Sequence, residues 1–391
     1  MRKVIKVVLC IIAALCIGML IGVGVVYIIV HQRNDSPVST ETEREIVIPT
    51  YLVETFYDES DNVDNSIYEY VAYETPDDED YETPSNLVTI TISAAGDTTL
   101  GGDTRWAGYH AFMREFENSG HDHSHFLQNV RHIFEESDLT ILNLEGTLTD
   151  ATAHMDKTFI FRGPPHFAQI LSSSSVGVVS LANNHTVDFF ERGYRDTIAS
   201  LQAEDIAYFG NEINTILEVN GIYVGLFGFS IWNDSHHNRN RIMAAIDDLQ
   251  QRGAQLIIAY HHWGIERDNR PTNYQRVIGR FTIDSGAHLV LGAHPHVLQG
   301  IEEYNGRNIV YSLANFCFGG HANPDDHDTF IFQQTFTFYE GVLQDTNDTN
   351  IIPAFISSVS DRNNFQPTPA TGEDAERILQ RLREYSDWLL D

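Results

Sequence analysis

The chain has 391 residues, and 42% of them are hydrophobic, which suffices for the buried core of one large domain or two ordinary ones. Its 55 acidic residues outnumber 24 basic ones and give a formal net charge of −31. This charge argues against nucleic acid as a partner, because binding to a phosphate backbone needs a basic surface.

The chain begins with an apolar segment of membrane-spanning length. Residues 7–30 carry no charge, and a helix of this length measures about 36 Å, enough to cross a hydrocarbon core about 30 Å thick. Arg2, Lys3 and Lys6 precede it. The positive-inside rule therefore predicts that residues 1–33 form a cytoplasmic tip and a single membrane anchor, with everything after them outside the cell. A cleaved signal peptide is the alternative, but its apolar core is usually only about 7–15 residues long.

Residues 34–86 have a different composition. Within them, residues 68–84 read YEYVAYETPDDEDYETP, which is acidic and poor in aliphatic side chains. Like charges repel and little can be buried, so we expect an extended, disordered spacer between membrane and domain. The alternative is a ligand for cell-wall cations or for a basic partner.

The sequence predicts a folded domain at residues 87–391. Short aliphatic runs indicate strands at residues 87–95, 139–144, 176–181, 223–229, 256–260, 288–291 and 308–312. Helical patterns occupy residues 125–137, 191–204, 239–252 and 272–285, and a closing amphipathic helix at residues 371–390 is capped by Thr371. This alternation predicts an α/β fold with a largely buried sheet. Cys317 is the one cysteine of this region, which excludes an internal disulfide and favours a bacterial cell-surface protein.

Polar residues cluster where five of these strands end. They are Asp97, Asn143 with Glu145, Asn183 with Asn184 and His185, His261 with His262, and His294 with His296. The carboxyl edge of such a sheet is where α/β folds place ligand sites. A single histidine after a strand is usually structural, but five clusters in succession predict a site. Carboxylate, amide and imidazole ligands without cysteine suit Mn, Fe or Zn better than Ca or Mg.

The short sequence motifs GD, NLE, NNH, HWG and GAHPH, in this order, resemble those of a known family. It is the bacterial CapA family of poly-γ-glutamate capsule-biosynthesis proteins, within the calcineurin-like metallophosphoesterases. The resemblance covers about residues 90–318. It implies a metallophosphatase-like layered sandwich of mixed β-sheets flanked by helices, and an N-terminal anchor with an outward domain.

The resemblance also implies the ligands of a first metal ion. Asp97 matches the first aspartate of the family pattern and His296 its last ligand, while Glu145 stands where an aspartate usually bridges two ions. Thr99 occupies the position of an expected histidine. We therefore expect the first ion to be held less tightly than the second, or to be absent.

The second ion is implied at Asn184, His262 and His294. His262 is chosen over His261 because it directly precedes the Trp-Gly of the family word. His185, beside Asn184, matches the histidine that donates a proton to the leaving group.

Several neighbouring residues have two interpretations each. Asp188 either orients the imidazole of His185 or caps the following helix. Glu266 either contacts substrate or holds its loop, and Arg162 either binds an anionic group of the substrate or is solvated. The histidines within residues 121–125 and 321–328 are expected in solvated loops, with further metal binding as the alternative.

We therefore expect a single-pass bacterial membrane protein whose extracellular domain acts on an anionic polymer, poly-γ-glutamate or a related wall polymer. In the hydrolase version, one or two divalent ions activate a water and stabilise the oxyanion of a phosphoester or amide, and His185 protonates the leaving group. The alternative is a non-catalytic accessory or scaffold subunit of a membrane polymer synthase or export complex.

Overall fold

The computed structural model describes residues 86–390. The predicted anchor and all but the last residue of the predicted spacer lie outside these residues. Among the helices of residues 86–390, none is long and apolar enough to cross a membrane.

The first of two large sheets has nine strands, with β1 (Leu87–Thr99) at its centre. The strand order is β18-β17-β15-β1-β2-β5-β6, with β14 added beside β1 and β16 beside β15. The other bounds are β2 Leu139–Leu144, β5 Val178–Ser180, β6 Ala207–Phe209, β14 Asn315–Phe318, β15 Asp328–Tyr339, β16 Val342–Leu343, β17 Asp348–Phe355 and β18 Thr368–Pro369. Strands β1, β2, β5, β6 and β14 run parallel, while β15 pairs antiparallel with β1 and β17 pairs antiparallel with β15.

The second sheet has seven strands in the order β12-β13-β11-β10-β8-β7, with β9 beside β10. Their bounds are β7 Thr215–Val219, β8 Ile222–Phe227, β9 Ser230–Ile231, β10 Leu256–Trp263, β11 Leu289–Ala293, β12 Ile301–Tyr304 and β13 Arg307–Val310. A short separate pair is formed by β3 (Thr147–Leu148) and β4 (Arg162–Gly163).

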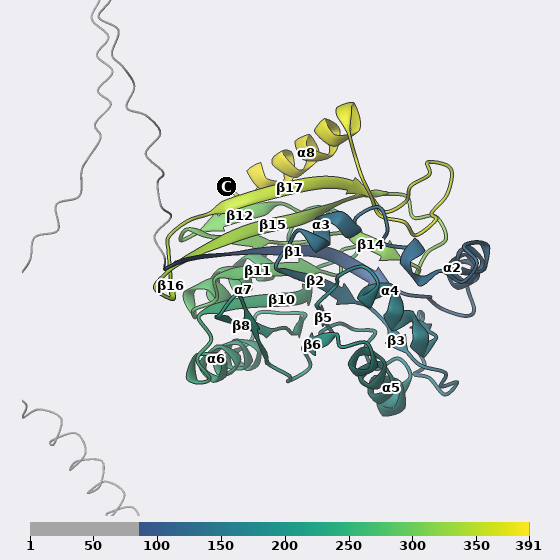
Figure 1. Cartoon of the computed structure of the whole chain (residues 1–391), viewed down its shortest axis with the longest axis horizontal. Helices are drawn as coiled ribbons and strands as arrows, with labels where there is room; N and C mark the ends of the chain where they lie inside the picture. The colour runs from purple at the N-terminus through teal and green to yellow at the C-terminus, as the bar shows by residue number, and fades with distance from the viewer. Residues whose placement is uncertain (1–85, 391) are drawn as a thin grey trace, which may run out of the picture. The chain divides into compact units, whose positions relative to one another are not determined.

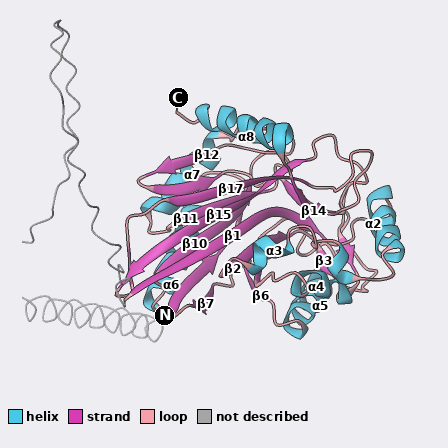
Figure 2. Cartoon of the chain, turned by 45° about the horizontal axis from the view of Figure 1, so that its top comes forward, coloured by secondary structure: helices cyan, strands magenta, loops and turns pink. Residues whose placement is uncertain are grey.

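The two sheets pack against each other and helices cover their outer faces (Figures 1 and 2). One apolar cluster fills the space between the sheets, and two further clusters bury each sheet against its helices. The helices are α2 Ala107–Asn118, α3 Arg131–Glu135, α4 Ala168–Ser172, α5 Phe190–Ala203, α6 His236–Gln251, α7 Asn273–Asp284 and α8 Gly372–Asp387, with single turns η1 His123–His125 and η2 Pro165–Phe167. Helix α8 contacts β17 of the first sheet and β12 of the second, so it closes one side of the sandwich.

The expected α/β sandwich of mixed sheets flanked by helices is confirmed, with differences in detail. The helix expected at residues 125–137 is wrong for most of its length, because only the five residues of α3 are α-helical there. Thr371 does occupy the N-cap position of α8, but its side chain makes no capping hydrogen bond. Helix α2 and the long antiparallel strands β15 and β17 were not predicted.

The parallel strands of both sheets end at the same edge of the sandwich. Strand β1 continues past its predicted end to Thr99, and β10 continues to Trp263. Asp97 is paired with Asn143 of β2 and with Asn315 of β14. The hydroxyl of Tyr260, in β10, donates across to the carbonyl of Ala95 at 2.9 Å and joins the two sheets directly behind this edge. The predicted polar clusters are thereby brought to one place.

Candidate metal centre

Five of the predicted ligands converge on one point where the two sheets meet. Their side chains form two overlapping groups, Glu145 with His294 and His296, and Asp97 with Glu145 and His262. Within each group one ligand atom per residue lies within 4.8 Å of the others. Glu145 belongs to both groups, as expected of a ligand shared by two ions. The groups themselves differ from the implied division, which placed Asp97 with His296 and His262 with His294.

Glu145 is the side chain of the centre that most clearly lacks hydrogen-bond partners. It is fully buried, and neither carboxylate oxygen has a hydrogen-bond partner in the part of the chain that the structure describes. The nearest histidine nitrogens are Nε2 of His262 at 3.6 Å, Nδ1 of His296 at 3.9 Å and Nε2 of His185 at 4.0 Å. Burial and the negative charge of Asp97 hold the pKa of Glu145 well above its usual value. A buried carboxylate in this state is stabilised by a cation, so the residues present fit a divalent metal.

Asp97 is held by a fixed set of donors. Oδ1 accepts from the side-chain amide of Asn143 at 2.8 Å, and Oδ2 lies 3.2 Å from the backbone nitrogen of His294 and 2.9 Å from Nδ1 of His296. Burial would lower the pKa of His296, but the charges of Glu145 and Asp97 raise it to about 10. The carboxylate of Asp97 and the imidazole of His296 are therefore in direct contact at the centre.

The backbone around the centre takes conformations that ordinary residues seldom adopt. His294 has a φ of 96° and His296 a φ of 60°, both in the left-handed region. A Cβ at Gly96 would lie 1.9 Å from the carbonyl oxygen of Ala314, so only glycine fits between Ala95 and Asp97. Such strain persists where the surrounding structure imposes it, and it is common at functional sites.

The ligands implied for the second ion also lie together. Oδ1 of Asn184 is 2.7 Å from Nε2 of His262, and the rings of His262 and His294 are 4.7 Å apart. Nδ1 of His294 is buried without a hydrogen-bond partner among the described residues. His261 points elsewhere, with its Nε2 3.2 Å from the hydroxyl of Thr282. The structure thus places His262, rather than His261, at the centre.

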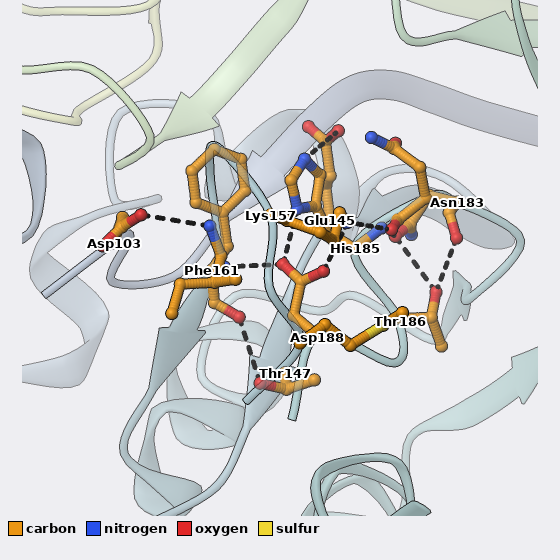
Figure 3. Close-up of polar contacts among 12 residues, drawn as sticks. Asp103, Glu145, Thr147, Lys157, Phe161, Asn183, His185, Thr186 and Asp188 are labelled. Atoms are coloured by element: carbon orange, nitrogen blue, oxygen red, sulfur yellow. Dashed lines mark hydrogen bonds and ion pairs between the residues drawn. The ribbon is translucent and has the colours of Figure 1, made fainter. Parts of the chain in front are cut away.

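His185 lies beside Glu145 and is oriented by Asp188 (Figure 3). Its Nδ1 is 2.6 Å from Oδ2 of Asp188, and its ring stacks on Phe161 with the centroids 4.1 Å apart. Asp188 also accepts from Nζ of Lys157 at 2.6 Å and from the backbone N–H of Phe161 at 2.8 Å. Burial lowers the pKa of His185, and Asp188 opposes that shift. Of the two roles considered for Asp188, the structure supports orientation of the imidazole, since Asp188 does not occupy the N-cap position of α5.

A cavity of about 320 Å³ opens beside His185 and His296. Its wall contains Phe159, Phe161, Glu266, Arg267, Asn269, Val297, Asn315, Phe318, Gly320, His321, Pro324, Asp325 and Asp326. Glu266 therefore lies where a substrate contact was predicted. Residues 321–328 were expected in a solvated loop, but four of them, His321, Pro324, Asp325 and Asp326, form part of this wall.

Arg162 does not reach the cavity. Its Nη1 donates to the carbonyl of Ala151 at 2.5 Å, and its guanidinium lies 5.4 Å from the centre of the Phe189 ring. The histidines of residues 121–125 also lie outside the cavity wall: Nε2 of His123 is 2.8 Å from Nδ1 of His166 and Nε2 of His125 is 3.0 Å from Glu115. The substrate contact predicted for Arg162 thus has no support from its position.

Two contributors were missed at the sequence level, Lys157 and Asn315. Asn315 places Oδ1 3.0 Å from Nδ1 of His296 and donates to the carbonyl of the same residue at 3.1 Å. Asn143 was named with Glu145 in the predicted polar cluster, but its hydrogen bond to Asp97 was not predicted. Lys157 lies in a loop without any pattern that marks it.

With this geometry established, the comparison with known proteins identifies the family. Residues 91–320 match the model of the bacterial capsule synthesis protein PGA_cap. The chain belongs to this family, as the sequence words predicted. The PGA_cap family is part of the metallophosphoesterase-like superfamily.

Relatives of this family were found in several bacteria. The chain is 30% identical over 212 residues to the PGA biosynthesis protein CapA of Bacillus subtilis strain 168, covering 49% of this chain and 56% of that protein. It is 29% identical over 185 residues to the capsule biosynthesis protein CapA of Bacillus anthracis, covering 42% and 45%. A probable polyglutamine synthesis accessory protein of Mycobacterium tuberculosis H37Rv is 24% identical over 222 residues, covering 48% and 58%. The chain thus spans about half the length of the curated relatives it matches.

Proposed function

We propose that this protein hydrolyses a phosphoester or amide bond of an extracellular anionic polymer, poly-γ-glutamate or a related wall polymer, with the help of one or two divalent ions. The observation that carries the proposal is Glu145, a fully buried carboxylate with two unpartnered oxygens at the meeting point of four other ligands. The names of the relatives from Bacillus subtilis and Bacillus anthracis support a role in capsule formation.

The donor set favours Mn, Fe or Zn, because it mixes carboxylate, amide and imidazole ligands without thiolates. Asp97 and His296 would hold one ion, Asn184, His262 and His294 would hold the other, and Glu145 would contribute to both. When bound, such ions supply Lewis-acid stabilisation of the negative charge that develops on the reacting oxygen.

The contact between His185 and Asp188 determines which nitrogen of the imidazole carries the hydrogen. An ionised carboxylate can only accept hydrogen bonds, so Nδ1 of His185 carries the hydrogen that is shared with Oδ2 of Asp188. Nε2 then remains free on the side of Glu145 and the cavity, where it can take up a proton and deliver it to the leaving group. Nζ of Lys157 donates to Oδ1 of Asp188 from the other side at 2.6 Å and places a positive charge beside this carboxylate.

We place the catalytic domain outside the cell on a single N-terminal anchor, with residues 34–86 as a spacer. The basis is the uncharged segment at residues 7–30 and the three basic residues that precede it. In this proposal the anchor binds membrane lipid, and polymer-synthase subunits of the same membrane are the expected partners. The negative charge of the protein would repel a polyanion at long range, but salt screens this repulsion and bound metal reverses it locally.

The second candidate is a non-catalytic accessory subunit that holds the nascent polymer at a synthase or export complex. Thr99 favours it, since this residue replaces a metal-binding histidine of the family pattern and its hydroxyl is buried without a partner among residues 86–390. One relative carries the word accessory in its name.

The test is hydrolysis of poly-γ-glutamate and of a generic phosphodiester by the full-length protein in detergent, loaded in turn with Mn, Fe and Zn. His185→Ala is the test variant, and His132→Ala, an exposed histidine of α3, is the matched control. Turnover that is lost in His185→Ala with metal content unchanged, and kept in His132→Ala, supports the hydrolase. Absence of turnover in the wild type with all three metals supports the accessory role instead.

A further inference from the structure

The cavity beside the metal centre carries charges of both signs that are not paired with each other. Arg267, Glu266 and Asp325 all line it, and none of the three makes a hydrogen bond or an ion pair through its side chain within residues 86–390. The fourth charged residue of the wall differs, because Asp326 is held by Arg381 at 2.7 Å and 3.0 Å. Three charged groups of one small cavity are therefore free to meet a ligand.

The backbone of Arg267 is held in place, whereas its side chain is exposed. Its φ of 63° lies in the left-handed region, and its N–H donates to the carbonyl of Pro295 at 2.8 Å. Pro295 stands between His294 and His296, so the metal-binding loop and the backbone of Arg267 are joined directly. A planar guanidinium at this position matches a carboxylate of a substrate that reaches the metal centre. Arg162, by contrast, has its guanidinium occupied by the carbonyl of Ala151.

Glu266 and Asp325 require a different ligand group. Two ionised carboxylates repel an anionic chain, and they accept hydrogen bonds from an ammonium group. A ligand that suits the three unpaired charged residues of the wall thus carries both a carboxylate and an ammonium, as an α-amino acid does. This deduction depends on the charges of the wall and does not need the identity of the polymer.

A γ-linked glutamyl chain has this combination at one position only. Each internal unit carries an α-carboxylate, but its nitrogen is part of an amide, whereas the first unit carries a free ammonium and a carboxylate on the same carbon. The cavity volume of about 320 Å³ is at the small end of ligand pockets, which suits a chain end better than a long segment.

Resting on the proposed function, we propose that the cavity binds the free amino end of a γ-glutamyl chain. Arg267 binds the α-carboxylate of the first unit, and Glu266 and Asp325 bind its ammonium group. The metal centre then lies beside the first units of the chain, so the protein acts on chain ends and not on internal units.

The test is a calorimetric titration of a γ-glutamyl tetramer and of its N-acetylated form into the full-length, metal-loaded protein in detergent. All variants are made in the His185→Ala background to prevent turnover. The unmodified tetramer is expected to bind at least about tenfold more tightly, because charge-assisted hydrogen bonds are lost on acetylation. Arg267→Ala should weaken both ligands by about tenfold or more, and the double variant Glu266→Gln with Asp325→Asn should abolish the difference between them.

Two control variants change the same charges elsewhere. Arg270 is on the same loop but lies over the ring of Trp388 at 5.1 Å, and the side chain of Asp361 is 79% exposed. Arg270→Ala and Asp361→Asn should leave both affinities unchanged. Equal affinities of the two tetramers, or no binding of either, would overturn the inference. The proposed hydrolase would survive such a result if wild-type protein still cleaves polymer or phosphodiester in a His185-dependent way, so the two failures can be distinguished.

Discussion

Two buried carboxylates on opposite sides of the His185 imidazole have opposite surroundings. Asp188 and Glu145 are both fully buried. Asp188 receives a lysine ammonium, an imidazole and a backbone N–H, whereas Glu145 receives no hydrogen bond from the described residues. A buried charge without a partner is costly, so the chain supplies the counter-charge of Asp188 and leaves that of Glu145 to an outside cation. The following predictions test this contrast.

The largest effect is expected for Glu145→Gln. A neutral amide cannot bridge divalent ions, so metal content should fall at least about tenfold and turnover by about a thousandfold or more. The metal-free variant should be at least as stable as metal-free wild type, because an unpaired buried carboxylate has been removed. Metal counting and thermal unfolding with and without chelator give both results. A variant that keeps its metal and its turnover would contradict the role of Glu145.

The same measurement of metal content tests whether the two sites hold their ions with different affinities. Because Thr99 replaces a histidine of the family pattern, wild-type protein should retain one ion per chain after dialysis. Two tightly held ions would show that the first site does not need that imidazole.

Asp188→Asn should slow turnover by about 10² to 10⁴-fold while metal content stays unchanged. The amide can no longer hold the charged form of His185, and its orientation of the imidazole is altered. The pH profile of turnover should shift as well, which a purely structural defect would not produce. Asp156→Asn is the control, since Asp156 is an exposed residue close in sequence to Lys157. Wild-type turnover and pH profile in Asp188→Asn would remove this residue from the mechanism.

The metal-free protein should lose stability as the pH falls from 6.5 to about 4. Burial lowers the pKa of His294 and His288 from 6.5 to about 4, and burial also lowers that of His261, to about 3. Between these values and 6.5 the unfolded chain binds more protons than the folded one, so the free energy of unfolding rises with pH. The effect should be on the order of 2 kcal/mol for each of these histidines. His296 acts in the opposite sense, because its raised pKa contributes stability below pH 6.5 that is lost as the pH rises through about 10.

Denaturant unfolding of chelator-treated protein at several pH values measures this slope. His288 lies away from the metal ligands and accepts from the backbone N–H of Ile257 at 2.9 Å. His288→Asn keeps an acceptor but cannot be protonated, so the slope between pH 4 and 6.5 should become shallower. An unchanged slope would mean that His288 is not neutral in the folded protein.

The sequence predicted the position of the metal centre better than the contacts of the loop side chains around it. Because parallel strands end at one edge, motifs such as NLE at the end of β2 and HPH after β11 had to meet there. Their residues Glu145, His294 and His296 do meet there, together with Asp97 and His262. Lys157 could not be predicted, since its contact with Asp188 joins a patternless loop to a position 31 residues further on. Sequence words fix which strand end a residue follows, but the direction of a loop side chain depends on the packing of the whole domain.

Arg162 and Arg267 illustrate this last limit, and the comparison of their variants gives the smallest expected effect. Arg162→Ala should lower the free energy of unfolding by about 1 kcal/mol, because the carbonyl of Ala151 loses its donor. It should leave the KM for polymer within about twofold of wild type, whereas Arg267→Ala should raise the KM about tenfold, since only Arg267 lines the cavity. Steady-state kinetics of the two variants decide between them. A KM raised equally by both would mean that Arg162 also binds the substrate, which is one of the two roles that the sequence left open.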